Sequence, residues 1–215
     1  MPKVKMKRQN IKMDMTAMCD VAFLLLTFFI LTTKFRPNEP VQVEIPASTA
    51  QIPIPEKDIL LISVGGDGRI FFGVDDQNTR LAILDELAKR KGFAVTGEMQ
   101  KHFKLIDQFG MPLEQLAQFL SLPSEDMGKY RHPGLVVNPK APLPGVPPGV
   151  NDDPTAKNDL AELIIIARSL NSKLRLAIKA DKGAEYKNID DVIETLRKTN
   201  SNRFNLITSA RGIVE

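Results

Sequence analysis

The chain has 215 residues and a formal net charge of +3, so it is long enough for one membrane anchor and one medium-sized domain. A net charge so close to zero gives no indication of nucleic-acid binding, which depends on a strongly basic surface. The single cysteine, Cys19, lies in an apolar stretch. The rest of the chain therefore has no disulfide available and must fold on its hydrophobic core alone.

The first predicted element is a transmembrane helix over residues 13–33. Only Lys34 and Arg36 follow its apolar run closely, whereas five basic side chains precede it: Lys3, Lys5, Lys7, Arg8 and Lys12. Positive charge concentrates on the cytoplasmic side of membrane spans. We therefore expect residues 1–12 to be cytoplasmic and the chain beyond residue 33 to be exported, as in a single-pass membrane protein, which is compatible with a bacterial periplasm.

A cleaved signal peptide is the main alternative for this segment, because a basic start and a short apolar run are typical of one. The residues after the run read TTKFRP and offer no cleavage site of the small-x-small kind. Asp20 also interrupts the apolar stretch. We therefore expect the segment to be retained as an anchor.

Asp20 is the candidate functional residue of this helix. At 100° per residue, Asp20 shares one stripe with Thr16 and Thr27. An ionised aspartate near the centre of a membrane helix costs about 2.5–3.5 kcal/mol on insertion scales. The stripe indicates a face that meets protein or water and holds a protonatable site. In the alternative interpretation Asp20 merely reaches the cytoplasmic interface, which the short aspartate side chain makes less favourable.

Residues 34–58 are predicted to form an extended linker. Five prolines within residues 36–57 favour extended backbone and prevent a helix. Residues 41–45 alternate apolar and polar side chains, so this part can pair as an edge strand. We expect the linker to become ordered against a partner.

Residues 59–215 are predicted to form an α+β domain, with a small mixed sheet and helices on one face of it. Its first block is a hairpin of two apolar strands, 59–64 and 69–73, joined by the turn sequence GGDG. A helix over 79–90 follows, with Gly92 beyond its end. Its predicted buried face comprises Leu81, Leu84, Leu87 and Ala88.

The last block of the chain repeats this pattern. It contains a strand over 174–180, a helix over about 189–199 and a closing strand over 204–209. Asn188 is a suitable N-cap for the helix, whose buried side is predicted to hold Ile189, Val192, Ile193 and Leu196. The resulting order, β-β-α followed by β-α-β, is typical of an α+β sandwich.

An insertion of unknown role is predicted between the two blocks, over about residues 93–172. It contains a short helical pattern at 112–122, seven prolines within 132–154 and a stronger helical pattern at 156–170. The apolar side of the last helix comprises Leu160, Leu163, Ile164 and Ala167. A long loop without secondary structure is uncommon inside a compact domain, but the flanking blocks match each other well enough to favour an insertion.

The sequence shows no catalytic constellation. His102 and His132 lie 30 positions apart in the predicted insertion, which gives little support for a metal site or for histidine-based catalysis. The only cysteine is in the membrane run, and GGDG lacks the following helix N-terminus that a phosphate-binding loop needs. We therefore expect a protein that is not an enzyme and uses no cofactor or metal.

The membrane stretch MTAMCDVAFLLLTFFIL resembles that of the ExbD/TolR family, in which a Thr-Pro pair precedes an aspartate that opens a single membrane helix. Thr16 and Asp20 match family positions, and Ala17 stands where the family has proline. The segment VQVEIPAST is similar to the family's post-membrane strand. The resemblance continues through ILLISVGGDGRIFFG and resumes at LRLAIKADKGAEYKNIDDVIETLRKTN, with matches at Ala180, Asp181 and Tyr186. It covers the chain except for residues 93–172.

The resemblance implies an energy-transducing subunit of a stator-like complex in the inner membrane. Its helix would sit inside a multi-helix partner resembling ExbB/TolQ, with Asp20 as the proton carrier and Thr16 and Thr27 as pore-facing support. Its periplasmic domain would pass force to a protein resembling TonB or TolA, for outer-membrane transport or envelope function. A strand after the membrane helix would bind a partner through Val41, Val43, Ile45 and Pro46.

Proteins of other classes are the alternatives. A membrane-anchored structural or partner-binding protein without proton coupling is the main one, and it predicts that Asp20→Asn is harmless. A flagellar-type stator would need a large peptidoglycan-binding domain, for which the sequence shows no motif. A secreted enzyme would need both signal cleavage and a catalytic constellation. At the exposed edges of a small sheet we also expect a homodimer or the capture of an extended partner segment.

Overall fold

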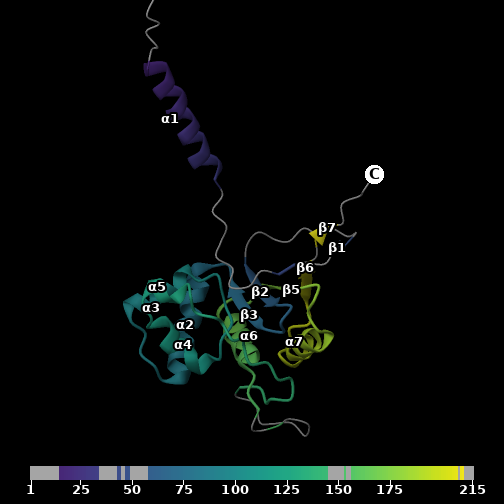
Figure 1. Cartoon of the computed structure of the whole chain (residues 1–215). Coiled ribbons are helices and arrows are strands. Elements are labelled where there is room, and N and C mark those ends of the chain that lie inside the picture. The colour runs from purple at the N-terminus through teal and green to yellow at the C-terminus, as the bar shows by residue number, and fades with distance from the viewer. Residues whose placement is uncertain are drawn as a thin grey trace, which may run out of the picture. The chain divides into compact units, whose positions relative to one another are not determined.

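The structure is a computed structural model that describes residues 15–33, 43–44, 47–48, 58–144, 153, 156–207 and 209–210. The chain divides into two compact units, Met1–Pro37 and Asn38–Glu215. The first unit contains helix α1 (Met15–Thr32), and the second contains the α+β domain (Figure 1).

Helix α1 is long and apolar enough to cross a membrane. Its 18 residues have a mean hydropathy of 2.0. They extend about 27 Å at 1.5 Å per residue, close to the thickness of the hydrocarbon core of a bilayer. The Thr32 hydroxyl donates to the Phe28 carbonyl at 2.8 Å, so this polar group is satisfied inside the helix. Within the described residues, the prediction of one N-terminal helix of membrane-spanning length and composition is confirmed.

Five strands of the described residues form one mixed sheet in the order β4-β3-β2-β5-β6. Strand β2 pairs with β3 as an antiparallel hairpin and with β5 in parallel. Strand β3 also pairs with β4 antiparallel, and β5 pairs with β6 in parallel. The bounds are β2 (Ile59–Val64), β3 (Ile70–Val74), β4 (Gln108–Phe109), β5 (Arg175–Ala180) and β6 (Phe204–Ile207). The predicted hairpin is confirmed, and the strands of the last block join it at β2.

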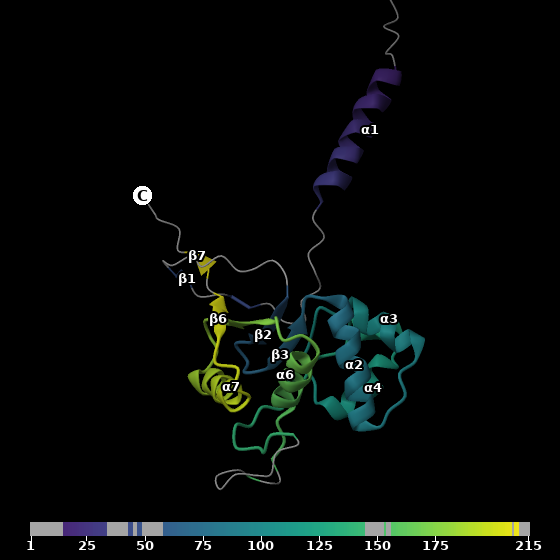
Figure 2. The same cartoon turned by 180° about the vertical axis from the view of Figure 1, so that it is seen from behind.

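The helices of the domain lie on one side of this sheet, as the two opposite views show (Figure 1 and Figure 2). They are α2 (Gln77–Lys91), α3 (Gly97–Leu105), α4 (Leu113–Leu120), α5 (Ser124–Met127), α6 (Asp159–Leu170) and α7 (Tyr186–Lys198). A membrane-spanning helix followed by a small mixed sheet with helices on one face confirms the predicted fold class.

The hydrophobic core lies between the sheet and these helices. Strand β2 buries Leu60, Ile62 and Val64, and their cross-strand partners on β3 are buried as well. The helices contribute further fully buried side chains, among them Leu84, Leu87, Leu160, Leu163, Ile164, Ala167, Val192 and Leu196. Burial of apolar surface is the dominant favourable contribution to folding, so the central strand and its helices form the stable body of the domain.

Helix α2 begins after an aspartate N-cap and ends at a glycine C-cap. The Asp76 side chain accepts a hydrogen bond from a backbone N–H of the first turn at 2.7 Å, and Gly92 adopts a left-handed conformation with φ of 72°. The predicted buried face is wrong at one position, because Leu81 is only half-buried. The buried stripe runs instead through Arg80 and Ile83, which places a charged residue in the interior.

Helix α7 begins at Tyr186, so the prediction that Asn188 is its N-cap is wrong. The N-cap position is Glu185, in extended conformation. Asn188 lies in the first turn, and its side-chain amide packs against Gly68, where a Cβ atom would come within 2.7 Å of the amide nitrogen. Gly68 has a φ of +80°, so both the close approach and the backbone conformation favour glycine there. The predicted apolar face is confirmed, with Val192 and Leu196 buried and Ile189 and Ile193 packed against the core.

The described part of the predicted insertion is folded against the sheet. The predicted helices at 112–122 and 156–170 are confirmed as α4 and α6, whereas α3, β4 and α5 have no counterpart in the sequence analysis. Strand β4 pairs with β3 at Gly73, where a Cβ atom would come within 2.4 Å of the Asp107 carbonyl oxygen. Strand β4 can therefore dock only because residue 73 is a glycine and has no Cβ atom.

A buried arginine of α2 connects the core to the segment before β4. Arg80 is 6% exposed. Its guanidinium donates to the Ile106 carbonyl and, at 3.4 Å, to the Asp75 carbonyl, and it pairs with the Asp107 carboxylate at 3.3 Å. A buried charge is tolerated only when it is paired and hydrogen-bonded. Arg80 therefore holds the residues that lead into β4 on the first turn of α2.

We predict that Arg80→Met lowers the free energy of unfolding by about 1–3 kcal/mol, because the substitution removes the hydrogen bonds that the buried guanidinium donates to the Ile106 and Asp75 carbonyl groups. Arg90→Met is the matched control on the same helix. Arg90 pairs with Glu86 nearer the surface, so its loss should cost at most about 0.5 kcal/mol. Urea unfolding of the full chain in detergent, followed by circular dichroism, measures both. Equal effects of the two substitutions would contradict the role assigned to Arg80.

A buried carboxyl group makes a second connection, between α6 and α4. Asp159 is 7% exposed and accepts a hydrogen bond from the Leu113 backbone N–H at 3.1 Å. Leu113 is the first residue of α4, and its N-cap, Pro112, supplies no side-chain hydrogen bond. Asp159 therefore caps α4 from the neighbouring helix. Burial raises the pKa of this carboxyl above its ordinary value of 3.8, against the lowering effect of the Leu113 hydrogen bond.

This raised pKa predicts that stability depends on pH. The folded protein holds the Asp159 proton more tightly than the unfolded chain does. The contribution of protonated Asp159 to the free energy of unfolding is therefore fully present below the ordinary pKa of 3.8. It is lost as the pH rises through the pKa of the folded state. We expect Asp159→Asn, which keeps a hydrogen-bond acceptor without the charge, to gain stability relative to the wild type from acidic to neutral pH. Urea unfolding of both chains over this pH range measures the difference, and a constant difference would contradict the prediction.

Candidate functional site

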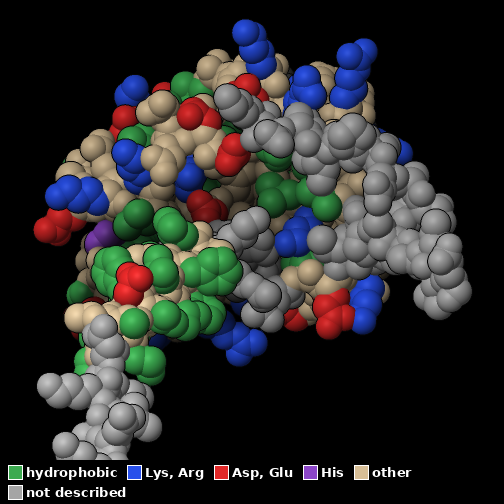
Figure 3. All heavy atoms as spheres, turned by 90° about the horizontal axis from the view of Figure 1, so that it is seen from above, with side chains coloured by type: hydrophobic (Ala, Val, Ile, Leu, Met, Phe, Trp, Pro, Cys, Tyr) green, Lys and Arg blue, Asp and Glu red, His purple; other side chains and the backbone are tan. Residues whose placement is uncertain are grey.

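Asp20 is the only charged residue of α1 and lies in the second turn of the helix. Thr16, four positions before it, and Thr27, seven positions after it, lie on the same face. No side chain of α1 is buried within the described part of the chain. Figure 3 shows the helix as a cluster of hydrophobic side chains with an acidic group at its surface. The whole helix, including the face that carries Asp20, is therefore available to lipid or to another protein.

The charge of Asp20 depends on groups outside α1. Thr27 lies about 10 Å farther along the helix axis, and its hydroxyl donates to the Leu24 carbonyl at 2.9 Å. An ionised carboxylate accepts several hydrogen bonds, whereas a single neighbouring hydroxyl group can donate only one. In an apolar environment Asp20 must therefore receive water or a polar partner, or take up a proton.

Part of the linker is bound to its own domain. The Glu44 N–H donates to the Asp181 carboxylate at 2.6 Å, and the Lys182 N–H donates to the Glu44 carbonyl at 2.9 Å. The Lys182 ammonium also pairs with the Glu44 carboxylate. We refer to Glu44, Asp181 and Lys182 as the linker contact. The same Asp181 carboxylate accepts the Gly183 N–H at 2.8 Å, so one side chain fixes both the loop after β5 and the linker.

A second pairing lies a few residues further along the linker. Strand β1 (Ala47–Ser48) pairs in parallel with β7 (Ser209–Ala210), close to the C-terminal end of the chain. The edge strand expected at 41–45 is not present at its described residues, 43–44, and the described strand of the linker is β1. Of the predicted partner-binding residues, Val43 is half-buried, and Val41, Ile45 and Pro46 lie outside the described residues. Their role in binding a partner stays a prediction.

The linker contact predicts a local effect of removing Asp181. We expect Asp181→Ala to speed hydrogen exchange at the Glu44 amide by roughly tenfold or more, because a hydrogen bond to a charged acceptor contributes about 1.5–3 kcal/mol. Lys182→Ala is the matched control, since it removes only an exposed ion pair and should leave this amide protected. Hydrogen exchange of the full chain in detergent, followed by mass spectrometry, measures both. Unchanged exchange in Asp181→Ala would contradict the contact.

These features define a class: proteins anchored by one N-terminal helix that carries a single acid, with a small α+β domain attached through a proline-rich linker. The profile of the family described as Biopolymer transport protein ExbD/TolR matches residues 6–211, nearly the whole chain. The chain belongs to the ExbD/TolR family. The matched range also includes residues 93–172. Neither the curated proteins nor the solved structures gave a significant match.

Membership of the family indicates the function in general terms. Its members are transport-associated proteins, not enzymes, with an energy-transducing role in biopolymer transport, and they generally work with ExbB/TolQ and TonB/TolA partners. The apolar N-terminal helix is consistent with the single-pass anchor of this family. No pattern in the sequence predicts the linker contact. Its one signal was Asp181, which matches a family position and lies directly after a buried strand.

Proposed function

We propose that this chain is the proton-motive-force-driven, energy-transducing subunit of a stator-like complex in the inner membrane. Asp20 takes up and releases protons, and the periplasmic domain passes the resulting force to a TonB/TolA-like protein for outer-membrane transport or envelope function. The observation that carries the proposal is the single carboxyl group on an otherwise apolar and unburied helix, in a chain of the ExbD/TolR family.

Protonation changes the environment that the Asp20 face prefers. The neutral acid can pack in an apolar contact, whereas the carboxylate requires water or a polar partner. A proton that crosses a membrane potential of 100 mV releases about 2.3 kcal/mol, enough to shift a two-state packing equilibrium roughly 50-fold. Proton passage past Asp20 can therefore move α1 between two arrangements inside its partner.

The surface of α1 supports a multi-helix partner resembling ExbB/TolQ. Every described side chain of the helix is exposed or half-buried, so a surrounding bundle would cover it completely. Thr16 and Thr27 lie on the Asp20 face, and small hydroxyl residues allow helices to approach closely in a membrane. We therefore place this face against the partner, with Thr16 and Thr27 beside the proton path.

Force would leave the membrane through the linker. With residues 1–12 in the cytoplasm, the linker joins a moving helix to the periplasmic domain, and the linker contact holds it there until a pull or a partner releases it. The strand around Val41, Val43, Ile45 and Pro46 would then bind the TonB/TolA-like protein. Strand β6 is an edge strand of the described sheet, and edge strands pair readily with other chains, which supports a homodimer.

The test is proton flow through the full chain, reconstituted with its own ExbB/TolQ-like partner in vesicles that enclose a pH-sensitive dye. Asp20→Asn keeps the size and polarity of the side chain but removes the proton site. We expect it to abolish flux driven by a pH gradient and to leave assembly with the partner unchanged. Asp20→Glu keeps a proton site on a longer side chain and should retain part of the flux.

Asp14→Asn is the control, because it removes an acid that precedes α1, and its flux should equal that of the wild type. If Asp20→Asn assembles with the partner and still conducts protons, the proton-coupling proposal is wrong. That result would favour the alternative, a membrane-anchored structural or partner-binding protein without proton coupling.

A further inference from the structure

The sheet has two faces, and the helices of the described residues cover only one of them (Figure 1 and Figure 2). Side chains alternate between the two faces along a strand. On β2, Leu60 and Ile62 point toward the helices and are completely buried in the core. Ile59, Leu61 and Ser63 therefore lie on the opposite face, which we call the outer face.

The outer face is apolar at its centre and has room there for another segment. Leu61 lies opposite Gly73 on β3 and Ala177 on β5, so its neighbours in this row are small. Ile59 and Leu61 line a hollow of about 210 Å³ at this place. Ser63 and Ala177 are only 1% and 2% exposed, although no described helix lies over them. Burial of this degree indicates that a further layer covers the outer face.

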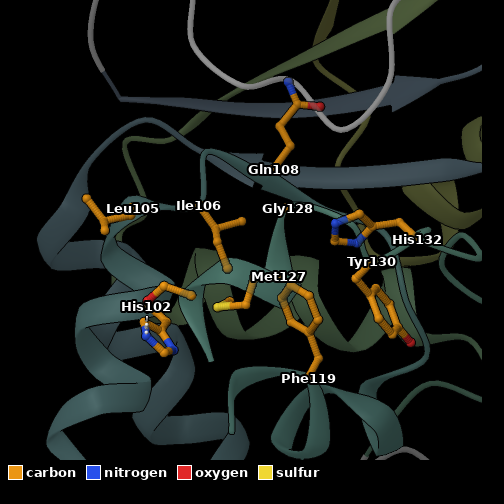
Figure 4. Close-up of a pocket in the computed structure, with 10 residues that line it drawn as sticks. His102, Leu105, Ile106, Gln108, Phe119, Met127, Gly128, Tyr130 and His132 are labelled. Carbon is orange, nitrogen blue, oxygen red and sulfur yellow. Dashed lines mark hydrogen bonds between the residues drawn. The ribbon is translucent and has the colours of Figure 1, made fainter. Parts of the chain in front are cut away.

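The two histidines of the predicted insertion line a different pocket (Figure 4). His102 and His132 lie on its walls, together with other residues of α3, α4 and α5. Gln108 of β4 lines both that pocket and the hollow of the outer face. Its side chain points away from Met127 (Figure 4), so β4 forms a wall between the two cavities. The outer face is thus a surface of its own.

The linker joins two described points at opposite ends of this face. Ser48 pairs with Ala210, in the segment that follows the carboxyl end of β6. Asp58 directly precedes the amino end of β2, and its carbonyl accepts from the Arg175 N–H at 2.8 Å. Strands β2, β5 and β6 run parallel to one another, so the two points are separated by the length of the strands. The six residues of β2 extend about 20 Å at 3.3 Å per residue.

Residues 49–57 must therefore run back along the sheet. Ten peptide units connect Ser48 to Asp58 and reach at most about 36 Å, which leaves little length for a detour around helices that are each about 10 Å across. Strands β3 and β5 occupy both edges of β2, so the segment cannot pair beside it. Asp58 has a φ of 59°, a left-handed conformation that is typical of a turn. The direct route back crosses the outer face.

The sequence of this segment suits an apolar face. Residues 51–55 read QIPIP, and no residue from 49 to 55 is charged. Pro53 and Pro55 favour extended backbone and have no N–H with which to extend a sheet. Residues two positions apart in an extended chain lie on the same side, so Ile52 and Ile54 can both contact the sheet.

The polar end of the hollow matches the end of the segment. Asp75 and Asp107 line the hollow as well, and the Asp75 N–H donates to the Ile59 carbonyl at 3.0 Å, next to the start of β2. Lys57 lies two positions before Ile59, so the segment brings a cation to this acidic end. Complementary charge fixes the register of a contact more than its strength, and here it favours a segment that enters β2 from the outer face.

We propose that the linker binds the outer face of its own domain, with Ile54 packed on Leu61 and Ile52 near Ser63. Ile54 lies four residues before the turn at Asp58 and Leu61 lies three residues after it, so the two reach about the same height along β2. Burial of the two isoleucines against this apolar face removes their surface from water and stabilises the contact.

This docking extends the attachment of the linker to its domain. Together with the linker contact and β1, it ties the chain to the domain from Glu44 to Asp58. Only residues 34–43 would then remain as a tether between α1 and the domain. The docking is independent of proton uptake at Asp20, because it involves residues of the α+β domain and the linker alone.

Cysteine pairs test this placement, because a disulfide forms only when the two Cα atoms lie within about 7 Å. The full chain in detergent first receives Cys19→Ser, which removes its only native thiol. Ile54→Cys is then combined either with Leu61→Cys on the outer face or with Leu206→Cys on the edge strand β6. Leu206 is 55% exposed, so its position is open to any segment that comes near. Mass spectrometry of unreduced peptides measures how fast each disulfide forms.

We expect the pair with Leu61→Cys to form a disulfide within one chain at least roughly tenfold faster than the pair with Leu206→Cys, because docking raises the effective concentration of the two thiols. Equal rates would overturn the proposal. A faster reaction of the pair with Leu206→Cys would overturn it too, because the segment would then lie along the edge of the sheet. Disulfides between two chains would mean that a second copy covers the outer face, which also contradicts the proposal.

The unmodified chain provides a check that does not depend on the folding of a variant. With ¹³C-labelled isoleucine and leucine methyl groups, nuclear Overhauser contacts report methyl groups that lie close together. We expect contacts between Ile54 and Leu61 in the full chain in detergent. If Ile54 shows none to Leu61, while Leu61 shows contacts to its neighbours within the sheet, the proposal is wrong.

Discussion

An ionised carboxylate is costly in an apolar helix, and this cost underlies the function proposed for the chain. Helix α1 has one charged residue, Asp20, and no side chain of the helix is buried in the described part of the chain. Because the helix cannot solvate this acid, its surroundings determine whether the acid is ionised. In the proposed function, proton uptake by this acid is linked to the packing of the helix, and the domain carries the resulting movement out of the membrane.

For this proposed role it matters that the central sheet of the domain and the linker contact are adjacent. Strand β2, which carries fully buried core residues, pairs with β5 along six residue pairs. Asp181 follows β5 directly. The Asp181 carboxylate binds the linker backbone at Glu44, and the Asp181 N–H donates to the Val64 carbonyl of β2 at 2.9 Å. In the proposed function, a pull on the linker would reach the centre of the sheet through these two hydrogen bonds. The folded segment around β4 is anchored to the same body by Arg80 and Asp159, and it adds a pocket without disturbing this path.

Regular elements with a strong apolar pattern could be predicted from the sequence, and contacts between distant segments could not. The hairpin strands and β5 are marked by apolar runs, and α2, α6 and α7 by apolar side chains at helical spacing. Strand β4 has two residues and α5 has four, which is too short for any period. Asparagine is preferred at N-caps, so the sequence predicted the start of α7 at Asn188. In the structure Asn188 lies inside the first turn, where its side chain packs against Gly68. Asp20 could be predicted as a candidate functional residue, because the energetic cost of a carboxylate in an apolar helix is evident from the neighbouring residues alone. The linker contact joins residues 137 positions apart, and the pocket that contains His102 and His132 exists only once β4 has docked.

The most direct test of the central claim is the protonation state of Asp20 in the assembled complex. Infrared difference spectroscopy between two pH values, on the full chain reconstituted with its ExbB/TolQ-like partner, detects the carbonyl stretch of a protonated carboxyl group. Asp20→Asn assigns the band. If Asp20 carries protons, a protonated-acid band appears as the pH is lowered and is missing in Asp20→Asn. An Asp20 that remains ionised at every pH at which the complex is intact would contradict it, because an acid that never takes up a proton cannot couple proton flow to movement.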